Sequence, residues 1–389
     1  MSIIPVNEPL IGAREIEYVS ECLRTGWISS SGRFIEEFER KWAATCGLKY
    51  GIAMSNGTTA LQAAVGCFGL RPGDKVIMPT FTIISCAQAI IYNGGIPVLV
   101  DSEPRTWCMD VVQVRAKVEA EMKKGDGKLK AIMPVHIYGH PVDMDPILEL
   151  AEKYNLKIIE DAAEVHGAEY LTGRATATPQ WKRCGGQGHI SVFSFYANKL
   201  ITTGEGGMVL TNDPAYVEKA RSLRNLCFLP HRRFYHTELG HNFRLTNLQA
   251  AIGLAQLERM EEIIARKRWM GKAYTERLQG IPGLQLPVEE PWARQVYRMY
   301  GLVLDENTGL DAVQFAQKLK AKGVETRPFF LGMHEQPVFH DMGLFRDEKY
   351  PVAERIARQG LYLPSGLTLT EAQLDRVCEA VRAGLDEAQ

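Results

Sequence analysis

The sequence predicts an α/β fold: a large domain built on a mixed, mostly parallel seven-stranded sheet, followed by a smaller α+β domain. Three observations predict it. Between residues 50 and 212, short runs rich in β-branched residues alternate with segments long enough to be helices. The runs are nearly all apolar, which is typical of parallel strands covered on both faces. After residue 258 the pattern changes to long helices with few strands.

Seven segments in this alternating region are predicted to be strands. Segments such as TTALQAAVGCFGL and MDPILELAEKYN, which separate some of them, are long enough to cross over as helices. Crossovers of this kind are right-handed. The predicted strands are 50–55, 75–79, 96–101, 129–136, 156–161, 190–195 and 207–212.

The chain is predicted to divide into a large domain, residues 1–258, and a smaller α+β domain, residues 259–389. The second domain contains a strand-like run at 297–305, a helix from about 311 to 322 and a last helix from about 370. The irregular segment LTGRATATPQWKRCGGQGH, residues 171–189, is rich in Gly, Thr and basic residues and is predicted to be a loop.

Composition excludes several classes of protein. The 389 residues carry a formal net charge of -1, which argues against a nucleic-acid binder with its usual basic face. The longest apolar runs are far shorter than the ~20 residues of a membrane span. We expect no signal peptide, because no basic region followed by an apolar run opens the chain. Eight scattered cysteines without a Cys-x-x-Cys pair favour free thiols and a cytoplasmic protein.

Ligands bind outside the carboxyl ends of strands in open α/β sheets, so the residues after each strand are candidates for a site. SNGTTAL follows strand 50–55 and opens a helix. Gly57 lets the backbone turn closely, and the helix N-terminus at Thr58 offers free N–H groups to an anion. A phosphate site is one interpretation, and a plain helix cap by Asn or Thr is the other.

Two further strands end in candidate residues. Phe81 follows strand 75–79, where an aromatic ring can stack on a flat ligand or belong to the core. Glu160 and Asp161 end strand 156–161. An acid at the end of a buried strand is costly without a cationic partner. That partner can be a protonated ring nitrogen or Mg²⁺, and an acid that caps the next turn is the structural alternative.

Lys199 follows strand 190–195 in the stretch SFYANKLITTGEGGM. A buried lysine is costly unless it has a partner or a function, and its amine is a nucleophile when held neutral or tied up as a Schiff base. Pyridoxal phosphate needs such a lysine, an acid at its pyridine nitrogen, donors for its phosphate and a group against its ring face. The chain offers these just beyond predicted strands: Lys199, Asp161, Gly57–Thr58 with Ser194, and Phe81.

The chain resembles the nucleotide-sugar aminotransferases of the DegT/StrS type, pyridoxal-phosphate enzymes with the aspartate-aminotransferase fold (fold type I). The resemblance covers nearly the whole length, and within the family it is closest to the perosamine synthase group, which aminates C4 of a GDP-4-keto-6-deoxyhexose. The matching motifs are TGWISSSGRFIEEFE (25–39), SNGTTAL (55–61), PVHIYG (134–139), IIEDAAE (158–164), FSFYANKLITTGEGGM (193–208) and GHNFRLTNLQAAIGLAQLE (240–258).

The resemblance implies a role for each matching residue. Lys199 bonds to the cofactor and later moves the proton between cofactor and substrate carbon. Asp161 pairs with the ring nitrogen and keeps it protonated. Glu164 stands at the family's Gln/Glu position beside the ring hydroxyl. The phosphate is held by Ser194 and by the backbone at Gly57 and Thr58.

The resemblance also implies a partner and a reaction type. Asn242, in GHNFR, matches an asparagine that reaches the phosphate in the neighbouring subunit, so a homodimer with two shared sites is expected. Some family members carry histidine in place of the lysine and are dehydratases. Because Lys199 is present, amino transfer is expected.

The segment between Tyr170 and Phe193 departs from the family. It is longer here by about ten residues, and His189 stands where the family has aspartate. One interpretation is a surface insertion. The sharper hypothesis is that basic and aromatic residues of the segment cover the substrate and change its specificity: Arg174, Trp181, Lys182 and Arg183.

Five further residues are candidates for substrate contacts, each with an equal case for a structural role. Trp27 and Ser29 lie near the start of the family's core, and Arg327 can hold a phosphate or a donor carboxylate with two hydrogen bonds. His334 and Tyr138 complete the set.

The predicted function is glutamate-dependent transamination of a keto carbon, C4 by the resemblance, of a nucleotide-linked deoxysugar in surface-polysaccharide, O-antigen or glycoside biosynthesis. The alternatives are a transaminase of a non-nucleotide keto-sugar, such as an octulosonate or an inosose, and a non-catalytic regulator with this fold. A Rossmann dehydrogenase is poorly supported, since no Gly-x-Gly-x-x-Gly follows the first strand.

Overall fold

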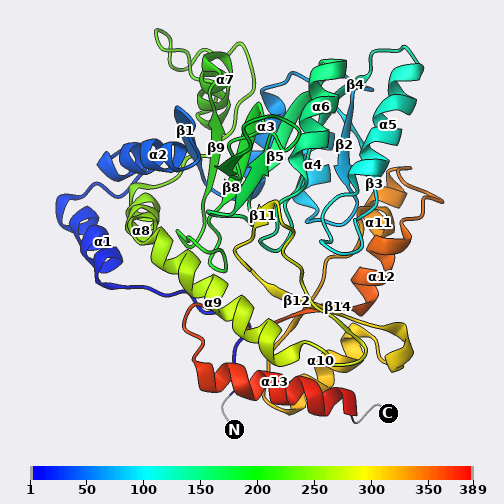
Figure 1. The fold of residues 1–389 in the computed structure, drawn as a ribbon. Helices are drawn as coiled ribbons and strands as arrows, with labels where there is room; N and C mark the ends of the chain where they lie inside the picture. The colour runs from blue at the N-terminus through cyan, green and yellow to red at the C-terminus, as the bar shows by residue number, and fades with distance from the viewer. Residues whose placement is uncertain (1–2, 387–389) are drawn as a thin grey trace.

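The structure, a computed structural model, describes residues 3–386. Its centre is a seven-stranded sheet with the order β1-β9-β8-β5-β4-β2-β3 (Figure 1). In this sheet β9 runs antiparallel to both of its neighbours, β1 and β8, and all the other neighbouring pairs are parallel. The predicted mixed, mostly parallel sheet is therefore confirmed. All seven predicted strands are present: β1 (Tyr50–Met54), β2 (Lys75–Pro79), β3 (Ile96–Val100), β4 (Leu129–Ile132), β5 (Lys157–Asp161), β8 (Ile190–Ser194) and β9 (Gly207–Thr211).

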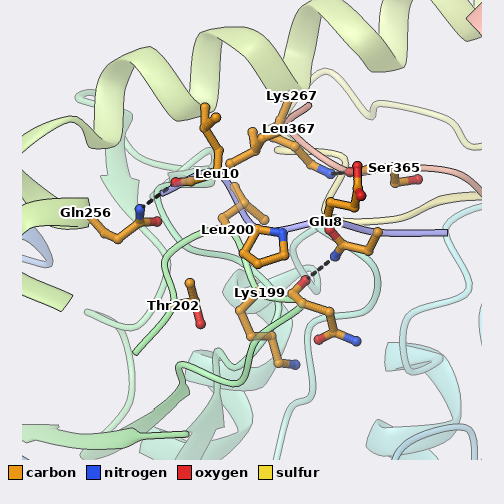
Figure 2. Close-up of a pocket in the computed structure, with 12 residues that line it drawn as sticks. Glu8, Leu10, Lys199, Leu200, Thr202, Gln256, Lys267, Ser365 and Leu367 are labelled. Atoms are coloured by element: carbon orange, nitrogen blue, oxygen red, sulfur yellow. Dashed lines mark hydrogen bonds between the residues drawn. The ribbon is translucent and has the colours of Figure 1, made fainter. Parts of the chain in front are cut away.

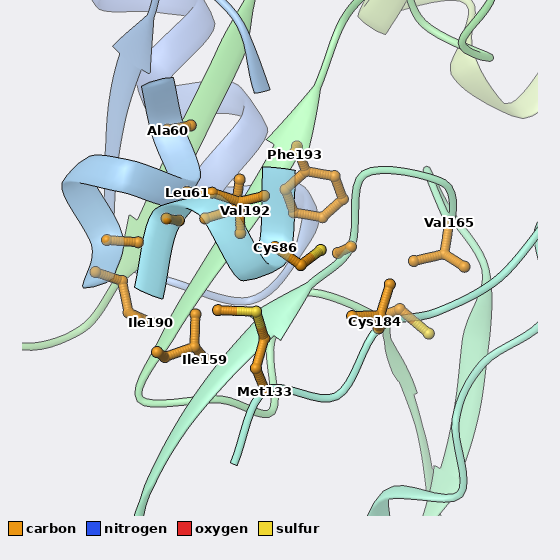
Figure 3. Packing of buried hydrophobic residues seen from close by; sticks show 14 of the residues in the cluster. Ala60, Leu61, Cys86, Met133, Ile159, Val165, Cys184, Ile190, Val192 and Phe193 are labelled. Carbon is orange, nitrogen blue, oxygen red and sulfur yellow. The ribbon is translucent and has the colours of Figure 1, made fainter. Parts of the chain in front are cut away.

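Helices pack around this sheet because its strands expose apolar side chains that must be covered. Helix α3 lies on β8 and β9 and contacts α4 and α7, whereas α5 and α6 contact β4 and each other. Figure 3 shows this core, with Leu61 of α3 in the same cluster as Ile159 of β5 and Val192 of β8. The helices are α1 (Ala13–Thr25), α2 (Arg33–Thr45), α3 (Gly57–Gly66), α4 (Ser85–Tyr92), α5 (Val111–Lys123), α6 (Met144–Tyr154), α7 (Pro214–Arg224) and α8 (Asn247–Glu258).

A second, four-stranded antiparallel sheet has the order β10-β12-β14-β13 and its own hydrophobic cluster. It lies below the large sheet in Figure 1, next to α9 and α13. Its elements are β10 (Leu284–Gln285), β12 (Tyr300–Leu304), β13 (Arg327–Pro328), β14 (Gly360–Leu363), α9 (Met260–Leu278), α10 (Ala312–Ala321), α11 (Pro337–Asp341), α12 (Pro351–Gln359) and α13 (Glu371–Asp386).

The division of the chain at residues 258 and 259 stays a prediction, and one segment crosses it. Ile4 belongs to the second hydrophobic cluster and pairs with Val324 in a parallel bridge. The N-terminal segment therefore lies with the C-terminal part of the chain. Within residues 3–386, no helix is both long enough and apolar enough to cross a bilayer.

The prediction that residues 171–189 form a loop is wrong in part, because residues 171–172 and 180–183 are strands. Strands β6 (Glu169–Thr172) and β7 (Gln180–Arg183) form an antiparallel pair, joined by β11 (Ala293–Arg294). The pairing is stabilised by residues distant in sequence: Arg294 stacks over Trp181, with 4.1 Å between the guanidinium carbon and the ring centre. Local composition cannot show contacts of this kind, so the segment's glycines and threonines suggested a loop.

Candidate active site

A cavity of about 590 Å³ lies at the carboxyl ends of the parallel strands. This size is within the usual range for small-ligand sites, about 300–1,000 Å³. Residues that follow β1, β2, β5 and β8 line it, together with residues from the second sheet. The structure brings seven of the predicted site residues to its wall: Gly57, Thr58, Tyr138, Asp161, Glu164, Ser194 and Lys199.

One end of the cavity is formed by the N-terminus of α3. Asn56 caps this helix by accepting a hydrogen bond from the Thr59 N–H at 2.9 Å. A Cβ atom on residue 57 would lie 2.6 Å from the Cβ of Ser194, so only glycine allows this close approach. A helix N-terminus beside a serine hydroxyl provides N–H and O–H donors for an anion. Capping and anion binding are therefore compatible here.

Asp161 ends β5 with its carboxyl group almost fully buried. One oxygen, Oδ1, accepts a hydrogen bond from the Ala163 N–H at 3.0 Å, and Oδ2 accepts one from the Cys86 thiol at 3.2 Å. Burial raises the pKa of Asp161 above its ordinary value, because these bonds and the nearby Lys199 offset the desolvation only in part. The carboxylate would be stabilised by a cation bound in the cavity.

Glu160 lies on the opposite side of β5 and does not line the cavity. Its oxygens accept hydrogen bonds from the His136 ring at 3.1 Å and from the N–H groups of Gln187 and Gly188 at 2.9 and 2.8 Å. Glu160 therefore stabilises the turn before β8 and is not available beside Asp161 as a second ligand for Mg²⁺.

Lys199 has a mostly buried side chain, 11% exposed, that lines the cavity. Its Nζ lies 3.4 Å from Oε1 of Glu164. Burial lowers the pKa of the Lys199 amine to about 8, and the Arg298 guanidinium acts in the same direction. Burial alone would raise the pKa of Glu164, but Arg298 and Lys199 bring it below its ordinary value. Lys199 thus loses its proton far more readily than an exposed lysine.

Arg298 is the main cavity residue that sequence reasoning missed. It lies just before β12, and its side chain is only 5% exposed. Its Nη1 lies 2.8 Å from Oε1 of Glu164. Its Nη2 donates to Oδ1 of Asn198 at 2.7 Å. The available signal was a single arginine within the otherwise apolar run VYRMYGLVL. Other missed wall residues are Thr82, Ser85, Asn198, Phe330 and Tyr362.

Two predicted residues are buried behind the wall. Phe81 is fully buried and packs against the rings of Tyr138, Phe329 and Phe330, so the residues of this strand end that reach the cavity are Thr82 and Ile83. The ring of His334 is held by the Thr80 hydroxyl at 2.7 Å. Neither Phe81 nor His334 lines the cavity, so neither is placed to touch a ligand in it.

Four further predicted residues lie on the surface, outside the cavity wall of this chain. Trp27 is 58% exposed, and Ser29 is exposed nearby. Arg327 lies at the start of β13 and forms an exposed ion pair with Glu325 at 2.7 Å. Asn242 is exposed, and its backbone pairs with that of Asn225 in an isolated antiparallel β-bridge. A contact of Asn242 with a cofactor therefore requires the site of another subunit.

No residue from 171 to 189 lines the cavity of this chain, so the hypothesis that the β6–β7 hairpin covers the substrate finds no support within one subunit and stays a prediction. Arg174 is bound by Asp143 and Asp145, and Arg183 by Glu261. The other two residues of the hypothesis also lie outside the cavity: Trp181 packs beneath Arg294, and Lys182 is exposed. The ring of His189 accepts a hydrogen bond from the Ile158 N–H. The surface-insertion interpretation fits these contacts.

Residues 9–382 match the DegT/DnrJ/EryC1/StrS aminotransferase family. The chain belongs to this family. This DegT/DnrJ/EryC1/StrS aminotransferase is 42% identical to a GDP-perosamine synthase of Caulobacter vibrioides, over 97% of each chain. It is 39% identical to a GDP-perosamine synthase of Escherichia coli O157:H7, over 98% of each. It superposes on DesI, solved in the presence of its TDP-sugar product, with a TM-score of 0.85 at 29% identity, over 99% of this chain and 93% of DesI.

These comparisons confirm the predicted family, fold and enzyme class, and the cofactor of this aminotransferase is pyridoxal 5′-phosphate. The cavity fits that group. Gly57 and Ser194 lie together at the N-terminus of α3, where N–H and O–H donors suit an anion, and the buried Asp161 carboxyl faces the cavity without a cationic partner in contact. The Tyr138 hydroxyl is buried without a hydrogen-bond partner. Bound there, pyridoxal phosphate supplies an electron sink for charge at the substrate carbon.

The residues on the cavity wall are placed so that they could supply binding and proton transfer. Ser194 and the N–H groups at the start of α3 could hold the phosphate, and Asp161 could hold a proton at the ring nitrogen. Lys199, with its pKa of about 8, could accept and return a proton near neutral pH. The other oxygen of Glu164, Oε2, accepts a hydrogen bond from the Tyr138 N–H at 2.8 Å, which helps to hold the carboxylate beside Lys199.

Proposed function

We propose that this aminotransferase moves the amino group of L-glutamate to C4 of a GDP-linked 4-keto-6-deoxyhexose. Glutamate becomes 2-oxoglutarate, and the C=O of the sugar becomes C–NH₂. The similarity to two GDP-perosamine synthases along nearly the whole chain carries the proposal. We further propose that the enzyme works in the cytoplasm and that its product is a precursor of a surface polysaccharide, such as the O-antigen, or of a glycoside.

The proposed site roles follow the positions on the cavity wall. Lys199 is the reacting amine and proton carrier, Asp161 the partner of the ring nitrogen, and Glu164 the neighbour of the ring hydroxyl. Of the substrate candidates, Tyr138 lines the cavity of this chain, whereas the exposed Trp27, Ser29 and Arg327 could contact a substrate only in the site of another subunit. The phosphate ligands in this proposal are Ser194, Gly57 and Thr58.

The substrate is tested by incubating the holoenzyme with L-glutamate and GDP-, dTDP- or UDP-linked 4-keto-6-deoxyhexoses, and with a free octulosonate and an inosose. We expect kcat/KM for the GDP sugar to exceed that for every other acceptor at least about tenfold, or about 1.4 kcal/mol. Formation of 2-oxoglutarate and the mass of the amino sugar are measured. Equal or better use of another nucleotide would overturn the choice of GDP, and preference for a free keto-sugar would overturn the nucleotide sugar altogether.

We also propose a homodimer in which Asn242 of each chain completes the site of the other. Asn242 is exposed and away from its own cavity, which supports a role across an interface. In this arrangement, Asn242→Asp would place a carboxylate against the phosphate in the partner's site and inactivate that site. Lys199→Ala would inactivate the site of the chain that carries it.

Mixing these two inactive variants after dissociation and reassociation tests the shared sites. Half of the reassembled dimers are mixed, and each has one intact site, so about one quarter of the wild-type activity is expected to return. Activity that stays at the level of the separate variants would show that Asn242 serves its own chain or none.

A further inference from the structure

One carboxylate oxygen in the cavity is shared by two cations. Oε1 of Glu164 lies 2.8 Å from Nη1 of Arg298 and 3.4 Å from Nζ of Lys199. All three side chains are close to nine-tenths buried or more, so water screens these interactions only weakly. The shorter contact belongs to arginine, which stays protonated at any pH that the protein meets.

Arg298 is fixed on its other sides as well. Its Nη2 donates to Asn198, the residue before Lys199, and its carbonyl oxygen accepts a hydrogen bond from Nζ of Lys267 at 2.8 Å. Lys267 of α9 also donates to the Ser365 carbonyl at 2.5 Å. Figure 2 shows Lys267 and Ser365 next to each other, in a group of residues that also includes Lys199. Hydrogen bonds to both its side chain and its backbone therefore hold Arg298 beside Glu164.

Lys199 has few other groups to stabilise its charge. Asp161 is the remaining carboxylate that acts on it, and its oxygens already accept hydrogen bonds from the Cys86 thiol and the Ala163 N–H. His166, close by and fully buried, is held neutral because burial lowers its pKa well below the ordinary value. The stability of the charged Lys199 ammonium therefore depends on whether the Glu164 carboxylate interacts mainly with Lys199 or with Arg298.

We propose that Arg298 is a positioning residue that sets the protonation of Lys199. By binding Glu164 it leaves the Lys199 ammonium without a full counter-ion, so the amine is neutral at a lower pH than it would otherwise be. Burial and the Arg298 charge both lower the pKa of Lys199, to about 8, which agrees with this geometry. The inference rests on the proposed role of Lys199 and deepens it, since a proton carrier must change its charge near the working pH.

Two substitutions are expected to move the pKa of Lys199 in opposite directions. Arg298→Met removes a positive charge and frees Glu164 for Lys199, so the pKa rises by about one unit or more. Glu164→Gln leaves two cations side by side and lowers it. In the double variant both charges are absent, and the pKa returns toward the wild-type value. A role confined to packing would not produce opposite signs.

The measurement uses the full-length apo-protein, in which the Lys199 amine is free. A limiting amount of acetic anhydride is applied across a pH series, and mass spectrometry follows acetylation of the peptide that contains Lys199. Arg298→Lys keeps a cation at the site and is expected to shift the pKa by less than about half a unit. Arg327→Met is the matched control, because Arg327 is exposed and outside the cavity.

A pKa that stays constant or falls in Arg298→Met would overturn the proposal. A thermal unfolding curve tests whether that variant folds. If it does not, the other two variants test the proposal. It would be overturned if the pKa of Lys199 does not fall in Glu164→Gln, or if it shifts by about one unit or more in Arg298→Lys. The result is independent of which sugar the enzyme uses, because no acceptor is present, so failure of the proposed function and failure of this inference are distinguishable.

Discussion

Replacing Lys199 with alanine is expected to abolish amino transfer, with a loss of turnover on the order of 10⁴-fold or more. Among the residues that the structure places on the cavity wall, Lys199 is the only lysine, so no neighbouring amine can take its place. The loss is measured as 2-oxoglutarate formation from L-glutamate in the presence of the keto-sugar. The visible absorption band of the lysine-bound cofactor is also expected to disappear, because the covalent bond to Nζ cannot form.

The matched control is Lys182→Ala, which makes the same change at an exposed lysine in the β6–β7 hairpin, outside the cavity. It is expected to keep both the band and the wild-type kinetics. Stability should not explain the difference, since Lys199→Ala removes a buried amine whose desolvation is unfavourable. A Lys199→Ala enzyme that keeps the band or more than a few per cent of its activity would disprove the assignment of Lys199.

Much of the cavity could be predicted from sequence because its residues obey a simple geometric rule. Asp161, Ser194 and Lys199 end or follow apolar strands, Gly57 follows another, and the carboxyl ends of parallel strands meet at one edge of a sheet. This rule predicts the edge of the sheet at which these residues lie, but it does not predict the direction in which each side chain points. Phe81 obeys it and yet turns into the core, because aromatic rings of the second sheet's region pack against it.

The rest of the cavity depends on packing between segments far apart in the chain. Arg298 and Tyr362 reach the wall only because the second sheet docks against the first, about 100 residues or more beyond Lys199. The loop interpretation of 171–189 was partly wrong for the same reason, since β11 and acids near α6 organise that segment. Asn242 would act on a second chain, so one chain's sequence pattern could suggest it only through a family resemblance.

These long-range contacts also explain the chemistry of the site better than the strand ends do. The strand ends bring Lys199 and Asp161 close together, but two buried groups of opposite charge would normally form an ion pair and lose reactivity. Lys199 does lie 3.4 Å from Glu164, but Arg298 lies closer to the same oxygen, and the Cys86 thiol donates a hydrogen bond to Asp161. In our proposal, the second sheet thus helps to keep Lys199 reactive, because it brings Arg298 to Glu164.

Asp161→Asn is expected to lower kcat on the order of 10²- to 10³-fold while the protein stays folded. An amide has nearly the same shape as the carboxylate and can still accept the Ala163 hydrogen bond, but it carries no charge to hold a proton at the cofactor's ring nitrogen. Electron withdrawal from the substrate carbon therefore weakens. We expect a similar rate loss with either substrate, because both half-reactions need that charge, and an altered absorption maximum of the bound cofactor.

Glu160→Gln is the matched control, since it makes the same change at the next residue, whose carboxylate lies outside the cavity. Glu160 accepts backbone hydrogen bonds from Gln187 and Gly188, so its loss should reduce the free energy of unfolding by about 1–3 kcal/mol. The kcat of the folded fraction should stay near wild type. The two neighbouring acids thus separate function from stability: if Asp161→Asn lost only stability, or Glu160→Gln lost only turnover, the assignment of Asp161 to the ring nitrogen would be wrong.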